Sequence, residues 1–301
     1  MNGILIVDKP AGLTSHDVVM RVRRALGTKK IGHTGTLDPF ATGVMVLLVG
    51  NATRLAQFVD KDEKEYEALV QFGCETDTGD VTGTPKAEGG MQADDVVRSL
   101  AAVEWDAVLG RFRGETMQTP PMYSAKKIDG RKLYDLARAG VEVERKPVRI
   151  VISKLELLPV QSIEPQTAVR IRVVCSAGTY IRTLAEDIGR EIGLGAHLTA
   201  LRRTRAGRFT LSDAINLDAL ENEADPAQRV RSISDAVEHL PAFQLSADRV
   251  DKTRSGLSTR TDGDGFQEGI PIRMLDQDSN LIAIGTYDLA NKIVKPKIVL
   301  V

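Results

Sequence analysis

The sequence predicts an α+β fold followed by a small β domain. Strand-like and helix-like segments are mixed along the chain, without the regular strand–helix alternation of a doubly wound fold. A boundary falls near Pro241, and short apolar runs separated by turn residues follow it. The chain has 301 residues, enough for two domains, because domains usually run to about 100–200 residues. We therefore expect domains at 1–240 and 241–301.

The first quarter of the chain contains five segments with clear patterns. A helix is expected from Thr14, which can form a capping box with Asp17, to Gly27. Its apolar residues recur at helical spacing, at Val18, Val22 and Leu26. Glycines and a proline make 29–43 a loop. Strands are expected at 4–7, 44–49 and 66–72.

The rest of the chain alternates between turn-rich stretches and regular elements. Polar or proline-containing sequence makes 73–90 and 110–130 irregular. Helices are expected at 94–103, 132–139 and 183–192. Strands are expected at 148–158 and 167–175, the second with strict apolar–polar alternation. The small domain should contain a turn at 263–265 and strands at 270–275, 281–284 and 293–301.

Composition narrows the class of protein. The hydrophobic fraction of 42% is sufficient to bury a core. The N-terminus lacks the basic lead and apolar run of a signal peptide, and the longest apolar runs are far shorter than the roughly 20 residues of a membrane span. Cys74, Cys175 and four scattered histidines give neither disulfide nor zinc spacing. We expect an intracellular protein without a metal site.

Charge is balanced overall but clustered locally. The chain has 40 basic and 41 acidic residues, so the global basic excess that often marks nucleic-acid binding is absent. The bases gather in two groups, Arg111, Arg113, Lys126, Lys127, Arg131 and Lys132, and then Arg202, Arg203, Arg205 and Arg208. Such groups suit local phosphate contacts, and ordinary solvated faces are the alternative.

The segment 32–43, Gly-His-Thr-Gly-Thr-Leu-Asp-Pro-Phe-Ala-Thr-Gly, is the densest in chemically informative residues. Pro39 favours extended geometry at Asp38, and the glycines allow tight turns and close approach of another backbone. Asp38 should therefore lie on a loop held by the buried strand that follows, a usual place for a catalytic group. An Asx turn is the alternative. A phosphate-cradling loop is conceivable, although the Gly-Lys-Ser/Thr ending is missing.

This segment resembles a motif of the TruB-type pseudouridine synthases, and other motifs agree in the family's order. They are Asp8-Lys9-Pro10-Ala11-Gly12, Lys64-Glu65-Tyr66, Pro121-Met122-Tyr123-Ser124-Ala125-Lys126-Lys127 and Gly178-Thr179-Tyr180-Ile181-Arg182-Thr183-Leu184. The stretch 76–80 is also family-like, and the resemblance covers roughly 3–241. The end of the chain resembles the family's PUA-like domain at 269–272 and 284–285. The resemblance implies a central mixed, mostly antiparallel sheet flanked by helices.

The resemblance also implies an activity: isomerisation of uridine to pseudouridine in the T-loop of tRNA, at position 55. The reaction involves neither redox change nor group transfer, so no cofactor or metal is expected. An insertion at about 113–149 would grip the T-arm of the tRNA. The C-terminal domain would touch the acceptor stem or serve folding only. The family's stand-alone members imply a cytoplasmic monomer that needs no protein partner and no membrane.

Three residues carry the chemistry by this resemblance. Asp38 would be the nucleophile, through attack on the ribose or through elimination of the base to a glycal. Arg182 would be its partner, since a cation within about 4–6 Å lowers a carboxylate pKa by roughly 1–3 units. Tyr66 would stack on the target base and help to remove the C5 proton. A surface ion pair for Arg182 and a plain strand aromatic for Tyr66 are the structural alternatives.

Further residues are expected to contact the RNA. By resemblance, His33 helps to hold the flipped-out strand, although a lone histidine is as often structural. Lys9 supports the loop or touches a phosphate. The remaining expected contacts are the pocket walls Tyr180 and Leu201 and the basic residues Lys126 and Arg131.

Three other functions are compatible with parts of the sequence. A non-catalytic RNA-binding or RNA-folding protein could keep the scaffold, but it would not need Asp38, Tyr66 and Arg182 together. A guide-dependent relative that works inside a small ribonucleoprotein is less favoured, because the chain has the tRNA-gripping insertion and a short C-terminal domain. Without the motifs, a phosphate-binding transferase would be the general alternative.

Overall fold

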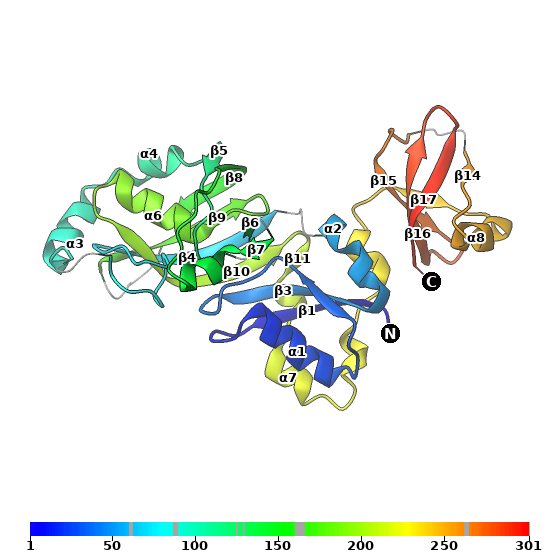
Figure 1. The fold of residues 1–301 in the computed structure, drawn as a ribbon, viewed down its shortest axis with the longest axis horizontal. Helices are drawn as coiled ribbons and strands as arrows, with labels where there is room; N and C mark the ends of the chain where they lie inside the picture. Colours follow the sequence, from blue (N-terminus) through cyan, green and yellow to red (C-terminus); the bar gives the residue numbers. More distant parts are fainter. Residues whose placement is uncertain are drawn as a thin grey trace.

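The computed structural model of the chain contains a large sheet with its helices and a smaller second sheet. It describes residues 1–59, 63–86, 90–124, 126–128, 130–159, 166–261 and 265–300. Figure 1 shows the second sheet, coloured orange to red, beside the blue-to-yellow body that holds the large sheet. None of the helices in these ranges is long and apolar enough to cross a membrane.

The large sheet has ten strands, in the order β12-β1-β3-β10-β4-β9-β8-β5, with β2 added on β3 and β11 on β10. Neighbouring strands are antiparallel except for the parallel pairs β1–β12 and β3–β10. The prediction of a mixed, mostly antiparallel sheet is therefore confirmed. The strands are β1 (Gly3–Lys9), β2 (Ile31–Thr34), β3 (Thr42–Val49), β4 (Lys64–Phe72), β5 (Gly114–Gln118), β8 (Val148–Leu157), β9 (Ala168–Cys175), β10 (Ala196–Ala206), β11 (Phe209–Thr210) and β12 (Ile215–Asn216).

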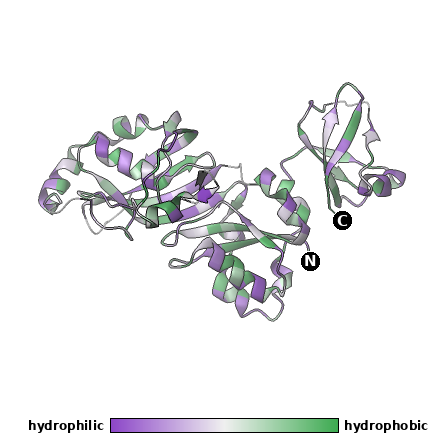
Figure 2. Cartoon of the chain, in the orientation of Figure 1, coloured by the Kyte–Doolittle hydropathy of each residue, from purple (hydrophilic) through white to green (hydrophobic). Residues whose placement is uncertain are grey.

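Two groups of helices cover different parts of this sheet (Figure 1). Helices α1 (Ser15–Ala25) and α7 (Leu217–Glu221) pack against β1 and β3. Helices α3 (Ala93–Ala101), α4 (Trp105–Gly110) and α6 (Ile181–Glu191) pack against β4, β8, β9 and β10. Figure 2 shows that these helices carry both hydrophobic and hydrophilic residues, as one-sided packing requires. The predicted capping box of α1 is present, with reciprocal hydrogen bonds between Thr14 and Asp17.

Short elements complete the body. A hairpin of β6 (Lys127–Ile128) and β7 (Arg131–Lys132) leads into α5 (Leu133–Arg138) within the predicted insertion. The other short elements are α2 (Ala56–Val59) and the 3-10 helices η1 (Gly50–Leu55), η2 (Leu211–Asp213), η3 (Pro226–Arg229) and η4 (Ile233–Val237).

The second sheet has the order β13-β15-β16-β17-β14. Its elements are β13 (Ala242–Gln244), α8 (Ala247–Arg254), β14 (Thr259–Arg260), β15 (Pro271–Leu275), β16 (Leu281–Asp288) and β17 (Ile293–Val299). It has a core of its own, and a few of its apolar residues also join a cluster with η4 and β3. The β-rich character of the chain's end agrees with the prediction, whereas the boundary near Pro241 stays a prediction. The predicted turn at 263–265 and the end of the last predicted strand, at Val301, lie partly or wholly outside the described residues.

Some elements differ from the sequence-based expectations. Strand β10 was not predicted, and its two register shifts and its run of basic residues explain why its alternation is hard to recognise. Strand β2 lies in the expected loop 29–43, and β5 lies in the expected irregular stretch 110–130. Both are short strands that add to an existing partner, so the pairing rather than the local sequence stabilises them.

Candidate active site

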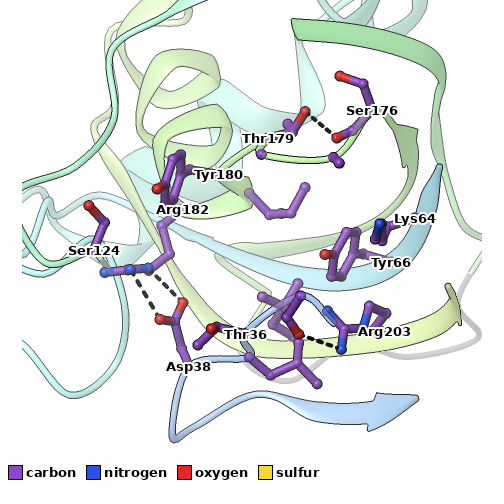
Figure 3. A pocket seen from close by; sticks show the side chains of 16 residues that line it. Thr36, Asp38, Lys64, Tyr66, Ser124, Ser176, Thr179, Tyr180, Arg182 and Arg203 are labelled. Carbon is purple, nitrogen blue, oxygen red and sulfur yellow. Dashed lines mark hydrogen bonds and ion pairs between the residues drawn. The ribbon is translucent and has the colours of Figure 1, made fainter. Parts of the chain in front are cut away.

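A pocket of about 260 Å³ opens where the loop between β2 and β3 meets β4, β10 and the start of α6. Figure 3 shows the pocket with its lining side chains. This volume lies just below the usual range for ligand pockets, roughly 300–1,000 Å³, and therefore suits a small group such as one nucleobase. The lining residues are Gly35, Thr36, Leu37, Asp38, Lys64, Tyr66, Ser124, Ser176, Ala177, Gly178, Thr179, Tyr180, Ile181, Arg182, Leu201 and Arg203.

Lys9, at the end of β1, holds the loop that carries Asp38. Its side chain has no exposed surface, and its Nζ donates hydrogen bonds to the carbonyls of Ala41 at 2.6 Å, Pro39 at 3.1 Å and Pro10 at 3.0 Å. Burial lowers the pKa of the Lys9 ammonium from 10.5 to about 8. This geometry supports the loop-holding role expected for Lys9 and leaves no exposed atom for a phosphate contact.

Arg203, on β10, holds the same loop from the other side. It is 1% exposed, and its guanidinium donates to the carbonyls of Val44 at 2.6 Å and Gly35 at 3.0 Å. Strand β10 approaches so closely that a Cβ added to Gly43 would lie 2.2 Å from the Arg203 carbonyl oxygen. Gly43 also has a φ of +106°, so both space and conformation require glycine there.

The guanidinium of Arg182 grips the carboxylate of Asp38. Arg182 Nε lies 2.9 Å from Asp38 Oδ2, and Nη2 donates to Oδ1 at 3.2 Å, which makes the pair bidentate. The Arg182 side chain is 5% exposed, whereas that of Asp38 keeps 34% of its surface open. The arginine is thus a buried anchor, and the structural alternative of a surface ion pair is wrong.

The electrostatic balance at Asp38 differs from the expectation. Burial raises the pKa of the Asp38 carboxyl, and the nearby Asp80 raises it further. Arg182 and Lys9 lower this pKa, as a cation should, but they do not outweigh burial, so the net shift is upward. The expected lowering by Arg182 is therefore present as one contribution and not as the net result.

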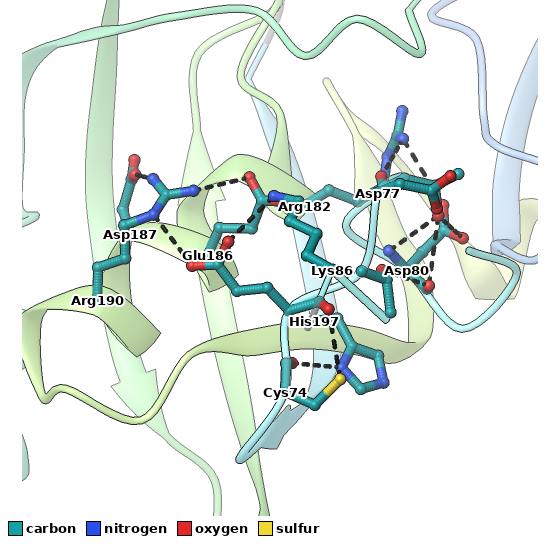
Figure 4. A network of polar contacts seen from close by, with 12 residues as sticks. Cys74, Asp77, Asp80, Lys86, Arg182, Glu186, Asp187, Arg190 and His197 are labelled. Atoms are coloured by element: carbon teal, nitrogen blue, oxygen red, sulfur yellow. Dashed lines mark hydrogen bonds and ion pairs between the residues drawn. The ribbon is translucent and has the colours of Figure 1, made fainter. Parts of the chain in front are cut away.

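Arg182 is itself fixed from several directions. Its Nη1 donates to the Thr78 carbonyl at 2.7 Å and lies 3.6 Å from Oδ2 of the buried Asp80. Its Nη2 also donates to the Tyr123 carbonyl at 2.6 Å. Behind it, Lys86 pairs with Glu186 of α6 at 3.2 Å, which ties the loop after β4 to the helix (Figure 4). These contacts give the guanidinium one orientation and aim it at Asp38.

Tyr66 on β4 lies across the pocket from Arg182 (Figure 3). Leu201 on β10 also lines the pocket. Tyr66 is 9% exposed, and burial raises the pKa of its phenol. A neutral phenol can stack on a base and exchange hydrogen bonds, but it is a poor base for a carbon-bound proton. Tyr180 lines the pocket next to Arg182, in the position that precedes α6.

The structure places the other expected RNA contacts outside this pocket. His33 lies on β2, paired with Leu47 of β3. Lys126 precedes the β6–β7 hairpin and is partly buried, while Arg131 is exposed on β7. The side chains of Lys127 and Lys132 are outside the described set.

Many of the clustered arginines are engaged in protein contacts. Arg202 pairs with Asp8 at 2.7 Å, Arg205 lies 3.9 Å from Glu63, and Arg208 pairs with Glu238. In the first cluster, Arg111 pairs with Glu191, and Arg113 pairs with Asp106 at 2.6 Å. These pairs favour the structural alternative for Arg202, Arg205 and Arg208, whereas Arg203 is buried in the protein and belongs to neither alternative.

Sequence reasoning missed two residues that hold the centre. Asp80 lies in the family-like stretch 76–80 but had no assigned role, and Arg203 was counted only as one of a basic cluster. The signal for Asp80 is a carboxylate among threonines, and its Oδ1 accepts from the Thr78 and Thr82 hydroxyls at 2.9 and 2.5 Å. No comparable local signal exists for Arg203, because its partners are main-chain carbonyls.

Comparison with known proteins agrees with this geometry. Residues 23–181 match the TruB family pseudouridylate synthase N-terminal domain, and residues 182–239 match the tRNA pseudouridylate synthase B C-terminal domain. The chain is 41% identical over 285 residues to tRNA pseudouridine synthase B of Heliobacterium modesticaldum, covering 95% of this chain and 90% of that one. It is 45% identical to the Bordetella avium protein of the same name, covering 82% and 96%.

A solved structure is similar over nearly the whole length. The chain superposes on a chain of a Cbf5-Nop10-Gar1 complex with a TM-score of 0.71 and 26% identity, covering 99% of this chain and 85% of that one. The two family matches together span well over half of the residues, and the curated relatives exceed 40% identity. The chain therefore belongs to the TruB family of pseudouridylate synthases.

Proposed function

We propose that this chain converts a uridine of tRNA to pseudouridine, at position 55 in the T-loop. The observation that carries the proposal is the Asp38 carboxylate, which faces the pocket while Arg182 holds both of its oxygens. The printed names of the relatives add the substrate class, because they are tRNA pseudouridine synthases.

The proposed reaction rearranges bonds within one nucleotide. The N1–C1′ bond breaks, the uracil turns within the pocket, a C5–C1′ bond forms, and the C5 proton leaves to a base. Asp38 acts as an ionised carboxylate, either as a nucleophile at the ribose or as the base that leads to a glycal. Arg182 keeps the carboxylate oriented and favours its charged form against the effect of burial.

Tyr66 and Leu201 are proposed to enclose the uracil. Stacking on an aromatic ring contributes about 1–3 kcal/mol per base, which helps to offset the few kcal/mol needed to flip a nucleotide out of its stack. Because burial raises the pKa of the Tyr66 phenol, we propose stacking and hydrogen bonding as its main contributions. Ionisation to a phenolate is not required for either.

The basic hairpin after Ser124 is proposed to bind the T-arm. Arg131 is exposed there and Lys126 is partly exposed, as residues that bind a phosphate backbone must be. His33 is proposed to support the RNA at the rim, from β2. We propose that the chain acts as a monomer in the cytoplasm, where tRNA is found.

A guide-dependent role is the second candidate, favoured by the similarity to a chain of the Cbf5-Nop10-Gar1 complex. That similarity has 26% identity, whereas the tRNA pseudouridine synthases reach 41–45% over most of the chain. The stand-alone role is therefore the better supported of the two.

The test uses an unmodified tRNA transcript that carries tritium at C5 of its uridines. Purified protein is added without cofactor or partner, and tritium release is followed beside an Asp38→Asn variant. Release by the wild-type protein alone, lost when the T-loop uridine is replaced by cytidine, is the expected result. No release by wild-type protein that binds the transcript would contradict the stand-alone activity, and release by Asp38→Asn would contradict the assignment of Asp38.

A further inference from the structure

The side chain of Gln118 forms a closed pair of hydrogen bonds with one residue of the active site. Its Oε1 accepts from the Tyr180 amide at 2.8 Å, and its Nε2 donates to the Tyr180 carbonyl at 3.0 Å. Gln118 ends β5 and is only 4% exposed, so water does not compete for these bonds. The side-chain amide of Gln118 therefore makes the two hydrogen bonds to the Tyr180 main chain that a neighbouring strand would otherwise make.

Tyr180 is the residue that the first turn of α6 depends on. It has extended geometry, with φ −97° and ψ 109°, and it makes no side-chain capping bond. Its carbonyl accepts the hydrogen bond of the Leu184 amide, which closes the first turn. Arg182 is the second residue of that turn, so the backbone conformation of Tyr180 determines the position from which the Arg182 side chain extends.

The segment after Gln118 returns to the same turn. Five residues later, the Tyr123 carbonyl accepts a hydrogen bond from Arg182 Nη2 at 2.6 Å. The first part of the insertion therefore contacts the start of α6 twice, through Gln118 at the Tyr180 main chain and through the Tyr123 carbonyl at Arg182. Through Arg182, residues 118–123 of the insertion are linked directly to Asp38.

We propose that Gln118 is a positioning residue that keeps the insertion in register with the Asp38–Arg182 pair. The inference rests on the proposed function, because the insertion is proposed to hold the RNA. RNA that binds the insertion then presents its uridine to Asp38, and residues 118–123 of the insertion also fix Arg182, the ion-pair partner of Asp38. Loss of the two Gln118 bonds should affect the chemical step more than RNA binding.

The first variant is Gln118→Ala, assayed by tritium release under single-turnover and steady-state conditions. We expect kcat to fall about 10- to 100-fold, since a displacement on the order of 1 Å at a reacting group can cost about 100-fold in rate. We expect KM to stay within about threefold, because Gln118 is buried and reaches no RNA. Circular dichroism and thermal melting confirm that the variant folds.

The second variant, Gln118→Glu, separates hydrogen bonding from packing. An ionised glutamate still accepts from the Tyr180 amide but cannot donate to its carbonyl, whereas a protonated glutamate restores both bonds. Two arginines donate to this segment: Arg182, to the Tyr123 carbonyl, and Arg145, whose Nη1 donates to the Pro120 carbonyl at 3.2 Å. Further charged groups line the hollow beside 119–122, including Glu142, Glu186, Asp187 and Arg190. The ratio of variant to wild-type kcat should therefore rise as the pH falls from 8.5 to 5.5.

Gln71 provides the matched control. Its Nε2 also donates to buried main chain, at Phe72 and Thr167, but it does not line the pocket. Gln71→Ala should leave kcat within about threefold of wild type. Equal kcat for folded Gln118→Ala and wild type, or a Gln118→Glu ratio that stays flat or falls as the pH is lowered, would overturn the positioning role. A wild-type protein without turnover would instead overturn the proposed function, and this inference with it.

Discussion

Replacement of Lys9 by methionine tests how the Asp38 loop is held. Methionine has a similar length but no charge and no donor, so the carbonyls of Pro10, Pro39 and Ala41 lose the hydrogen bonds from Lys9. Burial lowers the pKa of Lys9 from 10.5 to about 8, which means that the folded state favours the neutral amine. Between these two values an unfolded chain keeps a proton that the folded chain has lost, so Lys9 makes the wild-type protein more stable as the pH rises.

The size of this effect follows from the same two pKa values. One pKa unit corresponds to about 1.4 kcal/mol, so the full change across the window is about 3 kcal/mol. Most of it is reached within a practical range, about 2 kcal/mol between pH 7 and pH 9.5. The quantity to compare is the unfolding free energy of wild type minus that of Lys9→Met, because other titrations cancel in the difference.

Urea unfolding followed by circular dichroism at several pH values supplies this difference. Lys252→Met is the control, because it makes the same replacement at a side chain that is 49% exposed on α8. Parallel curves for wild type and Lys9→Met from pH 7 to 9.5 would show that the Lys9 pKa is not lowered, and they would refute the account of a buried ammonium under the loop.

Three further predictions concern the site and the RNA. Arg182→Lys keeps the positive charge but loses the guanidinium that contacts both oxygens of Asp38. Turnover should fall at least about 100-fold, given about 1.5–3 kcal/mol for each charged hydrogen bond. Single-turnover tritium release measures the turnover, and a smaller loss would contradict the bidentate role of Arg182. Because burial raises the pKa of Asp38, the rate should rise with pH through a midpoint above the ordinary value of 3.8, and a rate that is flat down to that pH would exclude this shift. Lys126→Gln and Arg131→Gln should each reduce the salt dependence of tRNA binding by about one phosphate contact, whereas the control Arg98→Gln, on α3, should not. Filter-binding titrations at several salt concentrations measure this dependence. If both hairpin variants have the same slope of affinity against salt as wild type, the hairpin does not contact the RNA backbone.

The sequence alone predicted the parts of the fold that local patterns determine. The capping box at Thr14 and the apolar spacing behind it identified α1, and the family motifs identified the Asp38–Arg182 pair. The prediction failed for β10, whose stability comes from partners on both sides and not from its own alternation. The net pKa shift at Asp38 was also beyond sequence reasoning, because burial is a property of the assembled pocket.

The contacts around Arg182 show a similar limit. Three of its acceptors, at Thr78, Tyr123 and Asp38, are separated from it by 59 to 144 residues in the chain. Two of them are main-chain carbonyls, which every residue has, so their identity leaves no mark in the sequence. Gln118 was missed for the same reason, since its partner is the main chain of Tyr180.

The two halves of the large sheet meet at a short parallel seam, where Thr42 and Gly43 of β3 pair with Arg202 and Arg203 of β10. Asp38 comes from one half, whereas Tyr66 and Arg182 come from the other. Neither half alone holds all three residues of the proposed reaction centre, so on this proposal catalytic activity reports on the joining of the halves and not on the formation of either.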